Sequence, residues 1–200
     1  MNRLLKLVLV PAALAFALSM SSVAFAGDAQ NYMQARQTEL TAVLKQPASP
    51  ARSQTVIRLV DSIFDYDKIA HDSLGRNAEG RTEEQLKEFT ELLRKLVRRA
   101  YQKNVEKTLN YDIAWLGDSG DNESSLVRSS AKSNQPGDNQ ETISIDYQLH
   151  KRDGHWAIGD VITEQSSLVS NYRNQFNKTI NKDGWDGLIR KLKNKVNTPG

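Results

Sequence analysis

Three histidines are the residues of this chain whose side chains could bind a metal or move a proton near neutral pH. His150 and His155 flank a predicted turn and could approach each other, but no third ligand stands near them, as a zinc site would require. We expect both to be solvated at the end of a hairpin. Asp67 and His71 are four residues apart on a predicted helix, which favours an ordinary ion pair over a pair of ligands. The sequence therefore predicts no metal site.

Carboxylates and hydroxyls offer a second possible chemistry. Asp65-Tyr66-Asp67 could hold a general acid or base, yet an aspartate that precedes an apolar run most often caps a helix. The abundant serines form no Gly-x-Ser-x-Gly elbow, and the chain has no glycine-rich phosphate loop. The absence of cysteine excludes a thiolate nucleophile, a thiolate metal site and any disulfide. These observations favour a protein that is not an enzyme and that needs no cofactor.

The first 26 residues have the pattern of a signal peptide. Arg3 and Lys6 precede the apolar stretch LVLVPAALAFAL, and residues 24–26 (AFA) form a small-x-small cleavage site. We expect cleavage before Gly27, export to the periplasm and a soluble mature protein, since no second hydrophobic run follows. Cleavage removes two basic residues and no acidic one, so the formal net charge of +3 falls to +1. A balance this small does not indicate nucleic acid as a partner.

Residues 27–104 are expected to be mainly helical. One helix is predicted over 29–44, before Pro47 and Pro50, and a second over 52–63. The best-defined helix begins at Thr82, because Thr82 and Gln85 have the spacing of a capping box. Its apolar stripe, flanked by cations, is typical of an amphipathic helix that lies on an apolar surface. The stripe consists of Leu86, Phe89, Leu93, Leu96, Val97, Ala100 and Tyr101.

From about residue 105 the apolar period changes to two, which indicates strands with one buried face. The alternation is clear over 109–115 and 143–149 and weaker over 126–132, and a last strand over 156–162 follows a hairpin turn at Asp153-Gly154. We expect an antiparallel sheet over 105–163. Its apolar face is predicted to carry Leu109, Tyr111, Ile113, Trp115, Ile143, Ile145, Tyr147, Leu149, Trp156 and Ile158.

The helical period returns after the last strand. Tyr172, Phe176 and Ile180 lie on one helical face, and a final helix carries an apolar stripe from Trp185 to Val196. Helices over 27–104, a sheet over 105–163 and helices over 164–200 predict one α+β domain, 27–200, that is long enough for a substantial core. Periodicity alone leaves open whether that core is solid or encloses a cavity.

Four segments carry a resemblance to a known family. They are FDYDKIAHDSLGR (64–76), TEEQLKEFTELLRKLVRRAYQKNVEK (82–107), GHWAIGDVITEQSSLVSNYRNQF (154–176) and INKDGWDGLIRKLKNK (180–195). The chain resembles the MlaC family, the periplasmic phospholipid-binding components of a lipid-transport ABC system, also called the toluene-tolerance family. The resemblance covers most of the mature chain. Its most specific part runs from the tryptophan of the third segment to the motif NYR-x-x-F.

The chain departs from the family pattern at four places. The family usually has a tryptophan in the segment that begins at Asn77, and an aromatic residue where Gly159 stands. It usually has an arginine where Gln148 stands and a glycine where Gln165 stands. These departures bear on the exact shape of a pocket and on headgroup contacts rather than on membership of the family.

The resemblance implies a curved antiparallel sheet like the nuclear-transport-factor-2 (NTF2) cone, packed with a helical subdomain, and diacyl chains held in an apolar cavity between them. It implies a carrier that shuttles glycerophospholipids between the outer and inner membranes and so maintains the lipid asymmetry of the outer membrane. The expected partners are phospholipid as cargo, an inner-membrane MCE-type ABC transporter complex and an outer-membrane lipoprotein–porin complex. The carrier itself is expected to be a monomer.

The same resemblance implies which apolar residues lie along the lipid tails. They are Leu74, Phe89, Leu93, Tyr101, Tyr111, Ile113, Ile145, Tyr147, Trp156, Ile158, Val161, Leu168, Tyr172 and Phe176. Arg173 could serve a phosphate headgroup. The preferred interpretation is an ion pair of Arg173 with Glu164 or Asp160 that locks the corner between the last strand and the helix that follows it.

Two other hypotheses remain open. An enzyme on a cone-shaped sheet, of the isomerase or dehydratase type, would use Asp112, Asp146 or Asp160 together with a tyrosine in the cavity. The sequence places Asp112 and Asp146 on the face opposite the apolar rows, which argues against them. A periplasmic adaptor would instead have a solid core and bind partners through the helices at 82–103 and 185–195. A cavity of lipid-tail size separates the carrier from the adaptor.

Overall fold

A computed structural model describes residues 27–136 and 142–198 of the chain. The predicted signal peptide, 1–26, lies outside the described residues. Among the described residues, no helix is both long and apolar enough to cross a membrane. The structure is α+β, with a five-stranded antiparallel sheet and helices before and after it, as the sequence predicted.

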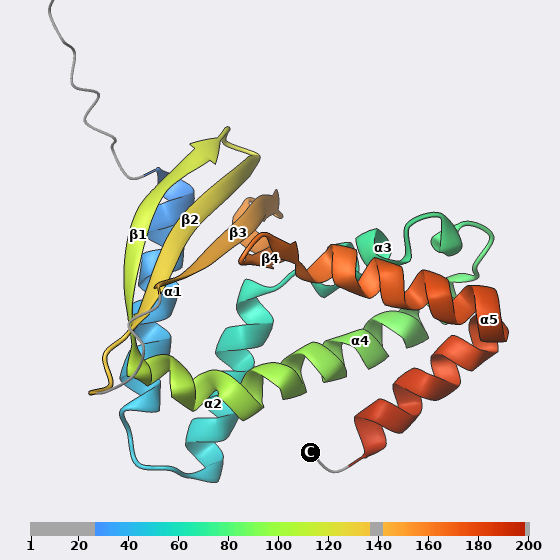
Figure 1. The fold of residues 1–200 in the computed structure, drawn as a ribbon, viewed down its shortest axis with the longest axis horizontal. Coiled ribbons are helices and arrows are strands. Elements are labelled where there is room, and N and C mark those ends of the chain that lie inside the picture. Colours follow the sequence, from blue (N-terminus) through green and yellow to red (C-terminus); the bar gives the residue numbers. More distant parts are fainter. Residues whose placement is uncertain (1–26, 137–141, 199–200) are drawn as a thin grey trace, which may run out of the picture.

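The sheet is a simple meander in which each strand pairs with the next one along the chain (Figure 1). Its strands are β1 (Tyr111–Gly120), β2 (Ser124–Ser133), β3 (Thr142–Arg152), β4 (His155–Thr163) and β5 (Ser166–Ser167). Asp153 and Gly154 have positive φ angles of 51° and 78° in the tight turn between β3 and β4. This is the conformation that an Asp-Gly hairpin turn favours, and it confirms the predicted hairpin.

The sheet is curved because its ladders are interrupted twice. The register between β1 and β2 shifts between Trp115 and Gly117, and Gly117 has a φ of 106°. The register between β3 and β4 shifts between Gln148 and Leu149. Bulges of this kind bend a strand and increase its twist, so the sheet can wrap around a space.

The helices lie against one side of this sheet and extend away from it (Figure 1). They are α1 (Asp28–Leu44), α2 (Pro50–Ile63), α3 (Tyr66–Leu74), α4 (Glu83–Asn104) and α5 (Leu168–Asn197), with 3-10 turns η1 (Gly75–Ala78) and η2 (Val105–Asn110). Helix α1 packs on β1 and β2, whereas α3 and α4 both pack on α5. The sheet and α1 form one end of the molecule, and α4 and α5 reach to the other end.

Local sequence signals account for most of the helix boundaries. Thr82 and Gln85 form the predicted capping box, with the Thr82 hydroxyl 3.3 Å from the Gln85 amide and the Gln85 amide oxygen 3.1 Å from the Thr82 nitrogen. Asp65 caps α3, as predicted, by accepting from the Lys68 amide at 3.0 Å. One prediction was wrong at its edge: residues 105–110 form η2, so β1 begins at Tyr111 rather than near Leu109.

Helix α5 bends sharply at Gly184, where φ is 70° and ψ is −179°. This kink separates the two C-terminal helices that the apolar stripes predicted. The second half turns back towards α4, where Lys193 pairs with Glu88 at 2.7 Å and Arg99 donates to the carbonyl oxygens near the end of α5. Phe89 of α4 then lies between Phe176 and Trp185 of α5, with ring centroids 5.3 and 5.9 Å away. This aromatic cluster is the core of the helical end.

Candidate functional site: an apolar cavity in two parts

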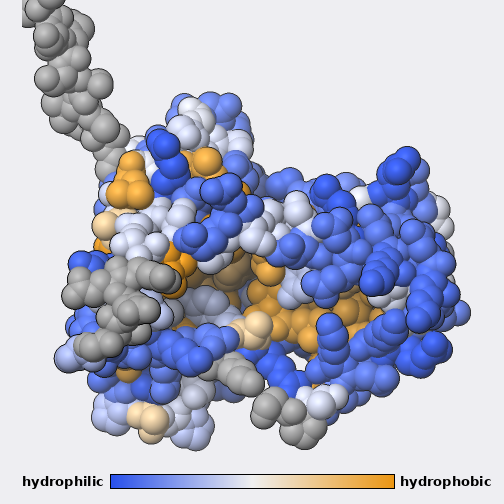
Figure 2. All heavy atoms as spheres, in the orientation of Figure 1, coloured by the Kyte–Doolittle hydropathy of each residue, from blue (hydrophilic) through white to orange (hydrophobic). Residues whose placement is uncertain are grey.

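Two adjoining apolar cavities lie between the sheet and the helices. The inner cavity, of about 150 Å³, is enclosed by the sheet, α1 and α2. The outer cavity, of about 600 Å³, is bounded by β3, β4, η2 and the facing sides of α4 and α5. Figure 2 shows the apolar hollow that opens between the sheet and these two helices. The walls of both cavities include Phe64, Tyr101, Thr108, Ile145 and Tyr147, which therefore mark a junction between them.

The junction is held by backbone pairing and by aromatic contacts. Phe64, which follows α2, forms an isolated parallel bridge with Ile158 of β4, and the next amide, of Asp65, donates to the Ile158 carbonyl at 3.0 Å. The Phe64 ring meets Tyr101 edge to face, with centroids 6.4 Å apart. On the sheet, Trp115 lies 6.2 Å from Tyr147. The linker after α2 is thus fixed to the sheet beside the cavity.

The structure brings eight of the predicted lining residues together around the two cavities. Those in the walls are Tyr101, Ile113, Ile145, Tyr147, Ile158, Val161, Leu168 and Tyr172. The other six line neither cavity. Leu74, Phe89, Leu93 and Phe176 are buried among the helices, Trp156 is buried beneath the Lys151 ammonium group, and Tyr111 stands at the start of β1.

Several wall residues were not among those expected to lie along the lipid tails. They come mainly from α1, α2 and the last turns of α4: Met33, Leu40, Val60, Ile63, Phe64, Val97 and Ala100. Most of them belong to helical stripes that the period of 3.6 identifies as buried. The period gives no sign that these stripes border a cavity, because a stripe has the same pattern whether it faces packed side chains or an open space.

Three tyrosines stand in the cavity walls beside uncharged polar residues such as Gln37, Asn104 and Asn171. Burial raises the pKa of Tyr147 to about 12. Burial, followed by the neighbouring charge of Tyr147, also raises the pKa of Tyr101, and burial raises that of Tyr172. All three hydroxyls are therefore protonated at neutral pH. The described residues of the two walls include no aspartate, glutamate, histidine or lysine. The one cation, Arg36, pairs with Glu39 at 2.9 Å.

The corner between β4 and α5 is locked by hydrogen bonds to Asp160 rather than by the predicted ion pair of Arg173 with Glu164 or Asp160. The Asp160 carboxylate accepts from the amides of Val161 at 2.8 Å and Val169 at 3.0 Å, and from the Ser167 hydroxyl at 2.5 Å. Two backbone amides and a hydroxyl thus converge on one carboxylate. Their convergence joins the end of the strand to the first turn of the helix.

Glu164 and Arg173 have separate roles. A Glu164 carboxylate oxygen accepts from the Ser144 amide at 2.5 Å, at the start of β3. Arg173 donates through Nε and Nη2 to the carbonyl oxygen of Asp72, at 2.8 and 2.6 Å, and so ties α5 to the end of α3. A cation suits that place, since the carbonyl end of a helix carries partial negative charge. The predicted ion pair was wrong because each side chain finds a closer backbone partner.

A second polar cluster joins the helices to the sheet outside the cavities. The prediction that His150 is solvated was wrong. Its Nε2 lies 2.9 Å from the buried carboxylate of Asp65, and that carboxylate also lies 3.4 Å from Arg152. His155 is exposed, as predicted. His71 lies 3.3 Å from Asp72, so the predicted pairing of His71 with Asp67 was wrong. The described part of the chain contains no group of three or more potential metal ligands.

Asp65 is expected to make stability depend on pH in the acid range. Burial by itself would raise the pKa of Asp65, but the Lys68 amide, the His150 ring and Arg152 outweigh it and hold the pKa below its usual value. The contribution of Asp65 is therefore complete above the unfolded-state pKa of about 3.9 and is lost as the pH falls through the lower folded-state pKa. Asp65→Asn should lower the free energy of unfolding by about 2 kcal/mol at pH 7.

Urea unfolding of wild type and Asp65→Asn between pH 7 and pH 3 measures this effect. The difference should narrow below about pH 4, since protonation removes the charge from the wild-type carboxyl as well. Asp67→Asn is the matched control, because Asp67 is exposed two residues further on. A difference that stays constant down to pH 3 would contradict the assignment.

The fold and the cavity together define a class of α+β proteins in which a curved antiparallel sheet and a helical layer enclose apolar space. Residues 34–194 match the family described as "MlaC protein", so the chain belongs to the MlaC family. No curated protein matches the chain.

A solved structure with the same fold is that of the phospholipid-binding protein from Ralstonia solanacearum in complex with a phospholipid. The TM-score is 0.71 at 24% sequence identity, and the similarity covers 85% of this chain and 97% of the other. The expected curved sheet with a packed helical layer is therefore confirmed.

Proposed function

We propose that this protein is a periplasmic phospholipid carrier that buries acyl chains in the inner and outer cavities. The observation that carries the proposal is the pair of adjoining apolar cavities between sheet and helices, whose outer part opens to the surface. Membership of the MlaC family supports it, and so does the phospholipid bound to a protein with the same fold. The described residues of the two walls include no carboxylate, histidine or lysine for acid–base chemistry, and a carrier needs none.

The energetics of acyl chains explain why a carrier must enclose its cargo. Burial of one methylene group is worth about 0.8 kcal/mol, so two chains of roughly 30 methylenes in total represent on the order of 25 kcal/mol of exposure cost in water. Spontaneous release of such a lipid is negligible. We therefore infer that the lipid leaves only when the cavity mouth docks against another apolar channel.

The proposed cycle shuttles glycerophospholipids between the outer and inner membranes and so maintains outer-membrane lipid asymmetry. Its docking partners, by resemblance to the family, are an inner-membrane MCE-type ABC transporter complex and an outer-membrane lipoprotein–porin complex. The carrier works in the periplasm as a monomer after removal of residues 1–26. It needs no cofactor, since the phospholipid is cargo.

Native mass spectrometry of protein purified from a Gram-negative periplasm tests the proposal. We expect complexes whose added mass equals that of a phospholipid, and the same lipids in an organic extract of the protein. Uptake of phospholipid from vesicles by the delipidated protein should reproduce the complex. Protein that carries no lipid and takes none up from vesicles would overturn the proposal.

The two alternative hypotheses find less support in the structure. Asp112, Asp146 and Asp160 line neither cavity, and Asp160 is engaged by backbone amides. An acid–base pair of one of these aspartates with a cavity tyrosine, as the isomerase or dehydratase hypothesis requires, is therefore not formed among the described residues. The adaptor hypothesis requires a solid core, whereas the space between sheet and helices is hollow.

A further inference from the structure

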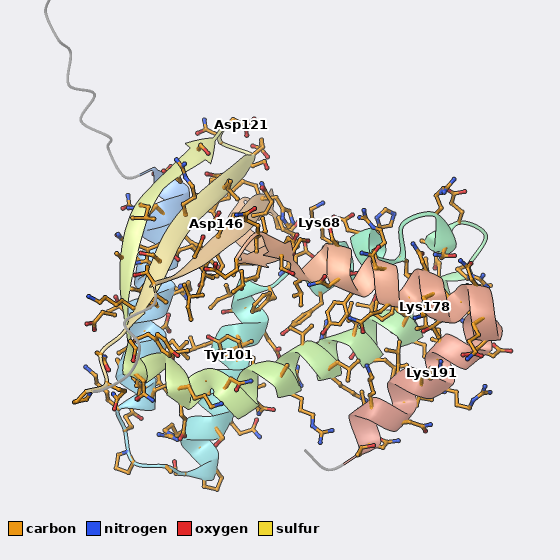
Figure 3. The ribbon with its side chains drawn as sticks, viewed as in Figure 1. Lys68, Tyr101, Asp121, Asp146, Lys178 and Lys191 are labelled. Atoms are coloured by element: carbon orange, nitrogen blue, oxygen red, sulfur yellow. The ribbon has the colours of Figure 1, made fainter. Side chains whose placement is uncertain are left out.

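Two unpaired hydroxyls stand at the junction of the cavities. Tyr101 projects from α4 towards the sheet (Figure 3), and Tyr147 projects from β3; both belong to the walls of the inner and the outer cavity. Within the described residues, neither hydroxyl makes a hydrogen bond, whereas the neighbouring Thr108 hydroxyl donates to the Val105 carbonyl at 2.5 Å. Both side chains are half-buried in the cavity walls, so their hydroxyls are available to a molecule that fills the cavity.

The two hydroxyls are neutral donors at the junction, where the other shared wall residues are Phe64, Ile145 and Thr108, whose hydroxyl already donates to the Val105 carbonyl oxygen. Burial raises the pKa of both tyrosines, and the neighbouring charge of Tyr147 adds to the shift of Tyr101, so both groups keep their protons at neutral pH. The outer wall contains no charged side chain among its described residues. The single cation of the inner wall, Arg36, is not part of the junction and pairs through Nη1 with Glu39. This environment suits a neutral oxygen acceptor better than a phosphate, which would require a cation or several charged donors.

We propose that Tyr101 and Tyr147 donate hydrogen bonds to the ester carbonyl oxygens of the bound lipid. This inference rests on the proposed function and specifies its cargo as acyl esters rather than any amphiphile with long tails. Phe64 and Ile145, which share the junction, supply apolar surface beside the hydroxyls. The ester groups, the most polar atoms of the tail region, would thus meet two donors that have no protein partner among the described residues.

A competition between ester and ether lipids tests the inference. Delipidated protein is incubated with vesicles that hold equal amounts of a diacyl and a dialkyl phosphatidylcholine of the same chain length, and mass spectrometry measures the ratio of the two lipids bound. The dialkyl lipid has the same headgroup and tails but lacks the carbonyl oxygens. Wild type should prefer the diacyl lipid by about three- to ten-fold, the value of one net hydrogen bond.

The double variant Tyr101→Phe, Tyr147→Phe removes both hydroxyls and keeps both rings. It should load the two lipids equally while its thermal midpoint stays close to that of wild type, since the lost hydroxyls have no protein partner among the described residues. Tyr32→Phe, on α1 and outside both walls, is the matched control and should keep the preference.

The possible outcomes are distinct. Loss of the preference in the double variant, with the preference kept in Tyr32→Phe, supports the inference. A wild type that binds both lipids equally, or a double variant that still prefers the diacyl lipid, overturns the inference and leaves the carrier function intact. A wild type that takes up neither lipid would overturn the proposed function and this inference together.

Discussion

Replacing Ala100 by tryptophan is expected to reduce phospholipid uptake from vesicles by about ten-fold or more. Ala100 lies near the end of α4, is itself exposed, and forms part of the outer cavity wall. An indole at this position would occupy space that the lipid tails need. Filling occupied apolar space costs typically 1–3 kcal/mol, and about 1.4 kcal/mol corresponds to a ten-fold change in binding. The fold should tolerate the change, because the side chain projects from an exposed position.

The measurement is the amount of lipid bound after incubation with vesicles, together with the thermal unfolding midpoint of each variant. Lys95→Trp is the matched control, since Lys95 is an exposed residue of the same helix that lines neither cavity. It should load lipid like wild type. Undiminished lipid uptake by Ala100→Trp would show that the cargo does not lie in the outer cavity.

The sheet side of the cavity could be predicted because the strand period of two is a strict geometrical rule. Ile145 and Tyr147 alternate with Ser144 and Asp146 along β3, and both apolar residues line the cavity. A bulge would have reversed the faces, but the bulge of β3 comes after Tyr147, between Gln148 and Leu149. The prediction from alternation therefore holds for the part of the strand that forms the wall.

The helical side could be predicted only in part. Phe89 and Val97 belong to the same apolar stripe of α4, yet Phe89 is fully buried against Phe176 and Trp185 whereas Val97 lines the outer cavity. The difference arises from α5, which packs on Phe89 with residues on both sides of its kink at Gly184, whereas around Val97 the first turns of α5 form the opposite wall of the cavity. The apolar pattern of α4 does not show which part of the stripe another helix covers, because that depends on tertiary packing.

The departures from the family pattern fall outside the cavity. Asn77, Gln148, Gly159 and Gln165 line neither the inner nor the outer cavity. Gln165 has a φ of 64°, a conformation that glycine adopts more readily, which accounts for the usual glycine at this position. Gly159 lies near His150 and Lys68, where an added Cβ would come within 3.1 Å of each. The departures therefore alter contacts beside the cavity rather than its wall.

Replacing Asp160 by alanine is expected to lower the free energy of unfolding by about 3 kcal/mol, since a carboxylate that accepts from two amides and a hydroxyl is lost. For a chain of this size the thermal midpoint should fall by about 6–12 °C. Lipid uptake should fall as well, because Val161 and Leu168, which flank this lock, belong to the outer cavity wall. Chemical and thermal unfolding, followed by the vesicle assay, measure the two effects.

Two further variants, Asp160→Asn and Asp112→Ala, distinguish the loss of the hydrogen bonds to Asp160 from the loss of a negative charge alone. The asparagine keeps one carboxamide oxygen for the amides of Val161 and Val169, and its NH₂ group can donate to the Ser167 hydroxyl, so its loss should be smaller than that of alanine. Asp112 is exposed and accepts only a long bond of 3.4 Å from Asn134, so its replacement should change stability by less than about 0.5 kcal/mol. Equal effects of Asp160→Ala and Asp112→Ala would contradict the lock. If stability and lipid uptake are lowest in Asp160→Ala, intermediate in Asp160→Asn and highest in wild type, the cavity wall depends on the hydrogen bonds that the Asp160 side chain accepts.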